Sequence, residues 1–88
     1  MIERKVSVIN KRGIHARPAS TIVQTAIKFK SAVELVKDGA AADAKSIMSV
    51  MMLAAAQGSE VTIRANGEDA QEVVDAIIAL FERKFNED

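Results

Sequence analysis

The chain has 88 residues, 49% of them hydrophobic and 27% charged, which suits one small domain spanning residues 1–88. Twelve basic residues balance twelve acidic ones; because nucleic-acid binding needs a basic surplus, we expect no nucleic-acid partner. The chain has no cysteine and one histidine, which excludes a disulfide scaffold and the usual zinc sites, so we expect no metal and no cofactor. No signal peptide or membrane-spanning run is present, which predicts a cytoplasmic protein that is not inserted in a membrane.

Alternation and helical spacing indicate the elements of the first half of the chain. Apolar and polar residues alternate over residues 2–8, which predicts a strand. The next apolar residues recur at helical spacing and predict a helix with one buried face: Ala19, Ile22, Val23, Ala26 and Ile27. Residues 33–35 alternate again as a second strand, and Asp38-Gly39 predicts a hairpin turn into a short return strand over residues 40–43.

The second half repeats the pattern of helix, strand and helix. Ser46 before an apolar run and Gly58 after it predict a helix with a serine N-cap and a glycine stop. Residues 61–65 alternate as a strand, and Asp69 with Glu72 forms a capping-box arrangement for the last helix. The buried stripe of that helix is predicted to be Val73, Val74, Ile77, Ile78, Leu80, Phe81 and Phe85. The order β-α-β-β-α-β-α predicts an α+β open-faced β-sandwich, a mostly antiparallel four-stranded sheet with three helices on one face.

The one histidine, His15, lies where the first strand leads into the first helix. The unpaired backbone N–H groups of a helix start form an anion site. Here the helix start comprises Ala16 and Pro18, which has no N–H but stiffens the helix entry, and Arg17 can bind phosphate oxygens. Imidazole is largely unprotonated near pH 7 and is nucleophilic, so this cluster predicts a phosphohistidine. The chain shows no nucleotide-binding loop, no His–Asp pair and no second histidine, which favours a phosphoryl carrier over a stand-alone catalyst. The alternative is a polar histidine that merely caps the helix.

The segment from Gly13 to Ser20, GIHARPAS, resembles the active-site motif of the HPr family, the histidine-containing phosphocarriers of the bacterial phosphoenolpyruvate-dependent phosphotransferase system. The resemblance extends over essentially all 88 residues. It implies that His15 accepts a phosphoryl group on Nδ1 from phosphorylated enzyme I and passes it to IIA proteins of sugar transport, with Arg17 aiding the transfer. A monomer suits such a diffusing carrier.

The segment that begins at Ser46 is the second candidate site. Its apolar run is too continuous for one buried face, so part of it should be exposed as a docking surface. This segment resembles the regulatory site that an ATP-dependent kinase, HPr kinase/phosphorylase, phosphorylates in the HPr family. The resemblance implies that Ser46 is the residue that accepts the phosphate. The implied docking residues for enzyme I and IIA proteins are Ser20, Ile47, Met48 and Met51. The alternative is that Ser46 only caps a helix whose methionines pack beneath it.

Two residues depart from the family pattern, and the chain end points to a paralogue. Arg12 stands where many relatives have a small polar residue, and it extends a predicted basic spot with His15 and Arg17. Ser49 stands where glycine is common in kinase-regulated relatives. Residues 80–88 resemble the nitrogen-branch paralogue, a regulatory phosphocarrier. Two alternatives therefore remain open: a nitrogen-branch or purely regulatory carrier, and a non-catalytic α+β binding module.

Overall fold

The computed structural model describes residues 1–87. The strands and helices are β1 (Ile2–Ser7), α1 (Ala16–Ala26), β2 (Ala32–Lys37), β3 (Ala40–Asp43), α2 (Ile47–Met52), β4 (Glu60–Asn66), α3 (Ala70–Glu82) and a short 3₁₀ turn, η1 (Lys84–Asn86). This confirms the predicted order and adds η1. The predicted buried face of the first helix is confirmed at Ala19, Ile22, Val23 and Ala26. It is wrong at Ile27, which lies just past the end of α1 and is 59% exposed. Asp88, the last residue of the ending that resembles the paralogue, lies outside the described residues. No helix within residues 1–87 has the length and apolar character needed to cross a bilayer.

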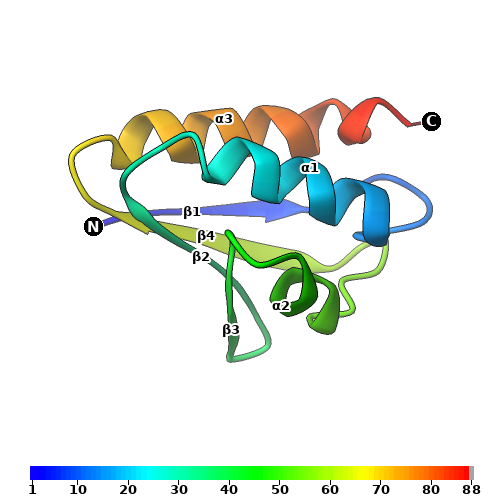
Figure 1. The fold of residues 1–88 in the computed structure, drawn as a ribbon. Helices are drawn as coiled ribbons and strands as arrows, with labels where there is room; N and C mark the ends of the chain where they lie inside the picture. Colours follow the sequence, from blue (N-terminus) through cyan, green and yellow to red (C-terminus); the bar gives the residue numbers. More distant parts are fainter. Residues whose placement is uncertain (88) are drawn as a thin grey trace.

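One sheet, in the strand order β1-β4-β2-β3, forms the base of the molecule, and every neighbouring pair is antiparallel. Along the central strands, apolar side chains such as Leu35 and Ile63 are buried. Their neighbours Glu34 and Arg64 lie on the opposite, more open face and form an ion pair with a 2.7 Å N–O distance. Helices α1 and α3 run side by side over the sheet, and α2 packs against α1 and β3 (Figure 1). The fold is therefore an α+β open-faced sandwich, as predicted.

Helix α2 begins as predicted but is shorter than predicted. Ser46 is its N-cap, and the Ser46 hydroxyl accepts a 3.2 Å hydrogen bond from the backbone N–H of Ser49. The helix ends at Met52, and Ala54 has a left-handed φ of 51°. The predicted extension to Gly58 is wrong because the chain turns away to bond the loop after β1, where the Ile14 N–H donates to the Ala55 carbonyl over 2.9 Å.

The predicted capping box at the start of α3 is also wrong. The Asp69 side chain makes no cap hydrogen bond. Its carboxylate instead accepts hydrogen bonds from the Ser31 hydroxyl and from the backbone N–H groups of Lys30 and Ser31, the last two at 2.9 Å each. These bonds, with the Ser31 hydroxyl the strongest contributor and burial opposing them, lower the pKa of Asp69 to about 2. Asp69 therefore joins the start of α3 to the chain just before β2.

The chain after α3 turns back toward the start of α1. Lys84, Phe85 and Asn86 all have left-handed φ angles, 54°, 54° and 61°. Such angles cost an L-residue roughly 1–2 kcal/mol each and persist only where packing holds them. Phe85, predicted on the buried stripe, is indeed buried and packs edge-to-face on Phe81 with ring centroids 4.9 Å apart. Residues 84–87 consequently lie at the same end of the molecule as the loop before α1 (Figure 1).

Candidate functional site

His15 is placed by a short loop that joins β1 to α1. Gly13 is buried in this loop with a φ of 67°, a conformation that glycine adopts without penalty. The Gly13 N–H donates to the Asn10 carbonyl over 3.2 Å, and Ile14 is bonded to Ala55 as described above. These contacts close the loop from both sides and present His15 as the N-cap residue of α1, which confirms the predicted position at the helix start.

The imidazole of His15 points to the end of the chain rather than capping the helix. The His15 backbone is extended, and its carbonyl accepts a 3.0 Å hydrogen bond from the Ala19 N–H. The side chain makes no cap hydrogen bond. Its Nε2 atom lies 2.9 Å from Oε2 and 3.2 Å from Oε1 of Glu87, 72 positions away in the sequence. The imidazole is therefore held by a tertiary contact that the histidine-cap alternative does not provide.

The Glu87 carboxylate is held in turn by Asn10, which is 1% exposed. Asn10 Nδ2 donates to Glu87 Oε1 over 2.9 Å and to the Gly13 carbonyl over 2.7 Å. Burial raises the pKa of Glu87, but the hydrogen bonds from Asn10 and His15 and the positive charges of His15 and Arg12 outweigh it and lower that pKa below its ordinary value. The carboxylate is thus ionised at neutral pH. Because an ionised carboxylate only accepts hydrogen bonds, His15 Nε2 is the donor.

The other nitrogen of the imidazole is unpaired within the described residues, and it belongs to the residue that precedes the first turn of α1. His15 Nδ1 makes no hydrogen bond with any residue from 1 to 87, and neither do the backbone N–H groups of Ala16 and Arg17. The Arg17 guanidinium is exposed and is likewise without a partner in the described part of the chain. Pro18 is buried in the first turn, where its missing N–H leaves no hydrogen bond unmade. Unpaired amides, the helix dipole and an arginine together suit a phosphate-sized anion.

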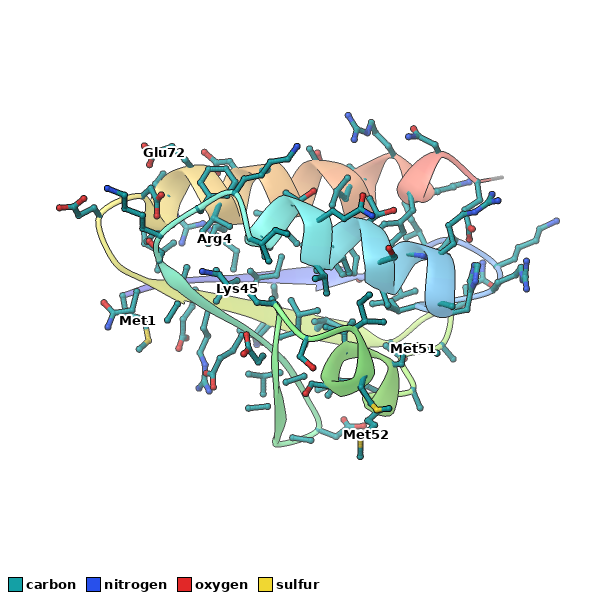
Figure 2. All side chains as sticks on the ribbon, viewed as in Figure 1. Met1, Arg4, Lys45, Met51, Met52 and Glu72 are labelled. Atoms are coloured by element: carbon teal, nitrogen blue, oxygen red, sulfur yellow. The ribbon has the colours of Figure 1, made fainter. Side chains whose placement is uncertain are left out.

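The apolar run that begins after Ser46 is exposed over much of its length, as predicted. Its exposed side chains are Ile47, Met48, Met51 and Met52, and we call these four residues the α2 patch. Figure 2 shows Met51 and Met52 on α2, the helix remote from α3. Met52 was not among the predicted docking residues, yet it is 80% exposed. Val50 is the buried residue of this helix, and the half-buried Ser20 lies on α1.

The α2 patch and His15 are joined through the backbone. The segment that leaves α2 reaches Ala55, whose carbonyl holds Ile14, the residue before His15. The chain after α2 is therefore hydrogen-bonded to the loop that presents the imidazole, although the two predicted sites lie about 30 residues apart in the chain.

Sequence reasoning missed two residues of this site, Asn10 and Glu87. It predicted a basic spot at Arg12, His15 and Arg17, and both arginines are exposed as that prediction requires. The spot also contains an acidic group, because Glu87 reaches the imidazole from the far end of the chain. No local pattern pairs positions 15 and 87; only the left-handed turn before Glu87 brings them together.

Comparisons with known proteins give a consistent family. A family model described as "PTS HPr component phosphorylation site" matches residues 2–83. The chain is 47% identical to "Phosphocarrier protein HPr" of Cupriavidus necator over 87 residues, which cover 99% of this chain and 98% of the relative. It is 46% identical to "HPr-like protein Crh" of Bacillus subtilis, and the match covers 96% of this chain and 99% of that relative. It is 44% identical to "Phosphocarrier protein NPr" of Proteus mirabilis, and the match covers 97% of this chain and 96% of that relative.

Solved structures agree with the fold. A crystal structure of an HPr from Thermoanaerobacter tengcongensis superimposes with a TM-score of 0.96 at 44% identity, covering 100% of this chain and 99% of the other. A second crystal structure from that organism, described as an HPr dimer, gives a TM-score of 0.79 at 45% identity, covering 99% and 100%. Fold and sequence therefore point to the same family over the whole described chain.

Proposed function

The chain belongs to the HPr family of phosphocarriers of the phosphotransferase system, and from this premise we propose that it carries a phosphoryl group on Nδ1 of His15. The group is received from phosphorylated enzyme I and is passed to IIA proteins. His15 is the nucleophile, while Arg17 and the N–H groups of Ala16 and Arg17 bind the phosphoryl oxygens. Pro18 stiffens the start of the helix that presents them.

The observation that supports this proposal is that the two nitrogens of the imidazole have different surroundings. Nε2 donates to Glu87, whereas Nδ1 has no partner in residues 1–87 and belongs to the residue that caps α1. A phosphoryl group on Nδ1 would lie near unpaired amides and a permanent positive charge, which stabilise its negative oxygens. No stabilising contact of the fold has to be broken to admit the group.

The direct test is transfer from phosphoenolpyruvate. The protein is incubated with enzyme I of the same organism, magnesium and phosphoenolpyruvate, and the product is analysed for bound phosphate. We expect an acid-labile phosphate on the wild type and none on His15→Ala. Label that survives in His15→Ala, or no label on the wild type, would contradict the proposal. Urea unfolding of both proteins shows whether the variant keeps its fold.

A nitrogen-branch carrier is the second candidate function. It is favoured by the resemblance of residues 80–88 to the nitrogen-branch paralogue and by the 44% identity to an NPr. The two candidates share the chemistry of His15 and differ in the acceptor. Transfer from the labelled protein to a sugar-type IIA and to a nitrogen-type IIA, compared at equal concentrations, separates them. Faster transfer to the nitrogen-type IIA would assign the regulatory branch.

We further propose Ser46 as a regulatory acceptor for an ATP-dependent kinase such as HPr kinase/phosphorylase. Ser46 is the N-cap of α2, where added negative charge is locally favourable, so phosphorylation need not unfold the helix. The charge would lie beside the exposed Ile47 and Met48 of the α2 patch and would oppose docking of acidic or apolar partner surfaces. Ser46→Asp should slow phosphorylation of His15 with the fold intact; unchanged kinetics would contradict this role.

The docking surface is proposed to comprise Ser20 and the α2 patch, with enzyme I and IIA proteins as occupants. The protein is proposed to act as a cytoplasmic monomer that exchanges partners quickly. A relative has been crystallised as an HPr dimer, so the oligomeric state calls for measurement. Sedimentation of the purified protein at micromolar concentration should give the mass of one chain, and a stable dimer would contradict the proposal.

A further inference from the structure

The carboxylate of Glu87 is the one charged group that contacts the imidazole of His15 within residues 1–87. Both side chains are largely shielded from solvent, at 24% exposure for His15 and 15% for Glu87. Water therefore competes weakly for the contact, and the 2.9 Å distance is that of a charge-assisted hydrogen bond. The pair resembles the carboxylate–histidine arrangements that orient imidazoles in catalytic and metal sites.

We propose that Glu87 is a positioning residue for phosphoryl transfer, which keeps the imidazole proton on Nε2 and leaves the lone pair on Nδ1. This inference rests on the proposed function, because it explains how His15 would act in it. A neutral imidazole has one proton to share between its two nitrogens, and only the bare nitrogen is nucleophilic. By accepting the Nε2 proton, Glu87 selects the tautomer that can attack phosphorus through Nδ1.

The transfer step balances with this assignment. The Nδ1 lone pair forms the new N–P bond while the bond between phosphorus and the donor's leaving atom breaks, and that electron pair departs with the donor. The Nε2 proton stays in place, so the ring becomes positively charged beside the Glu87 carboxylate. The attraction between ring and carboxylate is therefore stronger after transfer than before it, and this difference is what lowers the barrier. When the phosphoryl group moves on to an acceptor, the same steps run in reverse.

Two features hold Glu87 in position for this role. Phe85 anchors the left-handed turn in the core two residues earlier, and Asn10 donates to Glu87 Oε1. Asn10 thus faces Oε1, while Oε2 is the oxygen nearer to His15 Nε2. The two oxygens have different neighbours, and that asymmetry provides a sharp test.

Glu87→Gln should impair transfer more than Glu87→Ala, although glutamine is the closer match in shape. Asn10 is a donor at Oε1, so the glutamine oxygen takes that place and its NH₂ group faces His15 Nε2. Nε2 must then accept a hydrogen bond, which moves the ring proton to Nδ1 and blocks the nucleophile; an amide beside a catalytic histidine imposes the wrong tautomer in the same way. Alanine leaves the ring free to adopt either tautomer.

The experiment measures the rate at which enzyme I and phosphoenolpyruvate label His15 in the wild type and both variants. We expect a loss of about ten-fold for Glu87→Ala, the low end for orienting partners of histidine, and a larger loss for Glu87→Gln. Glu82→Gln is the matched control, because it removes one negative charge from an exposed position at the end of α3. Its rate should equal that of the wild type. Urea unfolding of all four proteins identifies any loss of fold.

A second measurement reads the tautomer without any transfer. Nitrogen-15 NMR of the neutral imidazole should show the proton on Nε2 in the wild type and on Nδ1 in Glu87→Gln. Variants that are labelled as fast as the wild type, or a wild-type ring protonated on Nδ1, would overturn this inference alone. A wild type that takes up no phosphate would overturn the proposed function and this inference with it.

Discussion

Replacing Gly13 with alanine should destabilise the protein by about 3 kcal/mol, because the loop before His15 leaves no room for a β-carbon. A Cβ at this position would lie 2.4 Å from the Ala55 carbonyl oxygen and 2.9 Å from the Ala56 Cα. Both are backbone atoms, and the Ala55 carbonyl also accepts the Ile14 hydrogen bond, so relief of the clash must disturb that bond. The φ of 67° adds strain that glycine does not feel.

The magnitude follows from three contributions. Overpacking against a fixed backbone costs about 1–3 kcal/mol. The left-handed φ costs alanine roughly 1–2 kcal/mol. Alanine has less conformational freedom than glycine in the unfolded chain, and this offsets the loss of stability by about 0.4–1 kcal/mol. For a domain of this length, a net loss near 3 kcal/mol lowers Tm by more than about 10 °C.

Gly39→Ala is the matched control for the strain alone. Gly39 has a φ of 82°, and no atom lies within 4 Å of a Cβ built there. The Gly39→Ala variant should lose only about 1 kcal/mol of unfolding free energy, because the strain at φ and the effect on the unfolded chain partly cancel. Urea unfolding at equal protein concentration gives both values, with unchanged m-values expected. Equal losses in the two variants would refute the reasoning, since the close approach to Ala55 would then have no energetic consequence.

Three further predictions concern other parts of the fold and the site. The folded-state pKa of Asp69, about 2, lies below its ordinary value of 3.8, so the stabilisation that Asp69 provides is present above about pH 4 and is lost as pH falls toward 2. Urea midpoints should fall over that range more steeply for the wild type than for Asp69→Asn, and equal slopes would contradict the assignment. Phe85→Ala should lower the free energy of unfolding by about 3–4 kcal/mol, measured in urea. It should also slow labelling of His15, because the turn before Glu87 loses its anchor. A loss of stability below about 1 kcal/mol would show that Phe85 does not hold the turn. Arg17→Ala should slow transfer to His15 while changing stability by no more than about 0.5 kcal/mol, and an effect chiefly on unfolding would show a structural role instead.

Features set by neighbouring residues were predictable from the sequence. The alternation around Leu35 and Ile63 indicated which side chains are buried, because successive residues of a strand face opposite sides. Asp38-Gly39 indicated the hairpin, since both residues tolerate the left-handed angles that they adopt, 50° and 82°. Ser46 indicated the start of α2, and the segment around His15 indicated the histidine at the start of α1. In each case the physical cause acts within a few residues.

Some local patterns were overridden by contacts from elsewhere in the fold. Asp69 is placed like a capping residue, but the backbone N–H groups of Lys30 and Ser31 and the Ser31 hydroxyl offer its carboxylate more hydrogen bonds than α3 does. Helix α2 ends at Met52 although apolar residues continue past it, because Ala55 is needed to bond Ile14. Competition between near and distant partners is not visible in a single sequence.

The sequence by itself determined the order of elements, most of the buried faces and the histidine at a helix start beside an arginine. Each of these follows from local sterics or from hydrophobic periodicity. Only the tertiary structure decided the strand order β1-β4-β2-β3 and the partner of the imidazole. Glu87 meets His15 because a left-handed turn, anchored by Phe85, reverses the chain after α3. Such a contact between the two ends of the chain exists only once the core between them has formed.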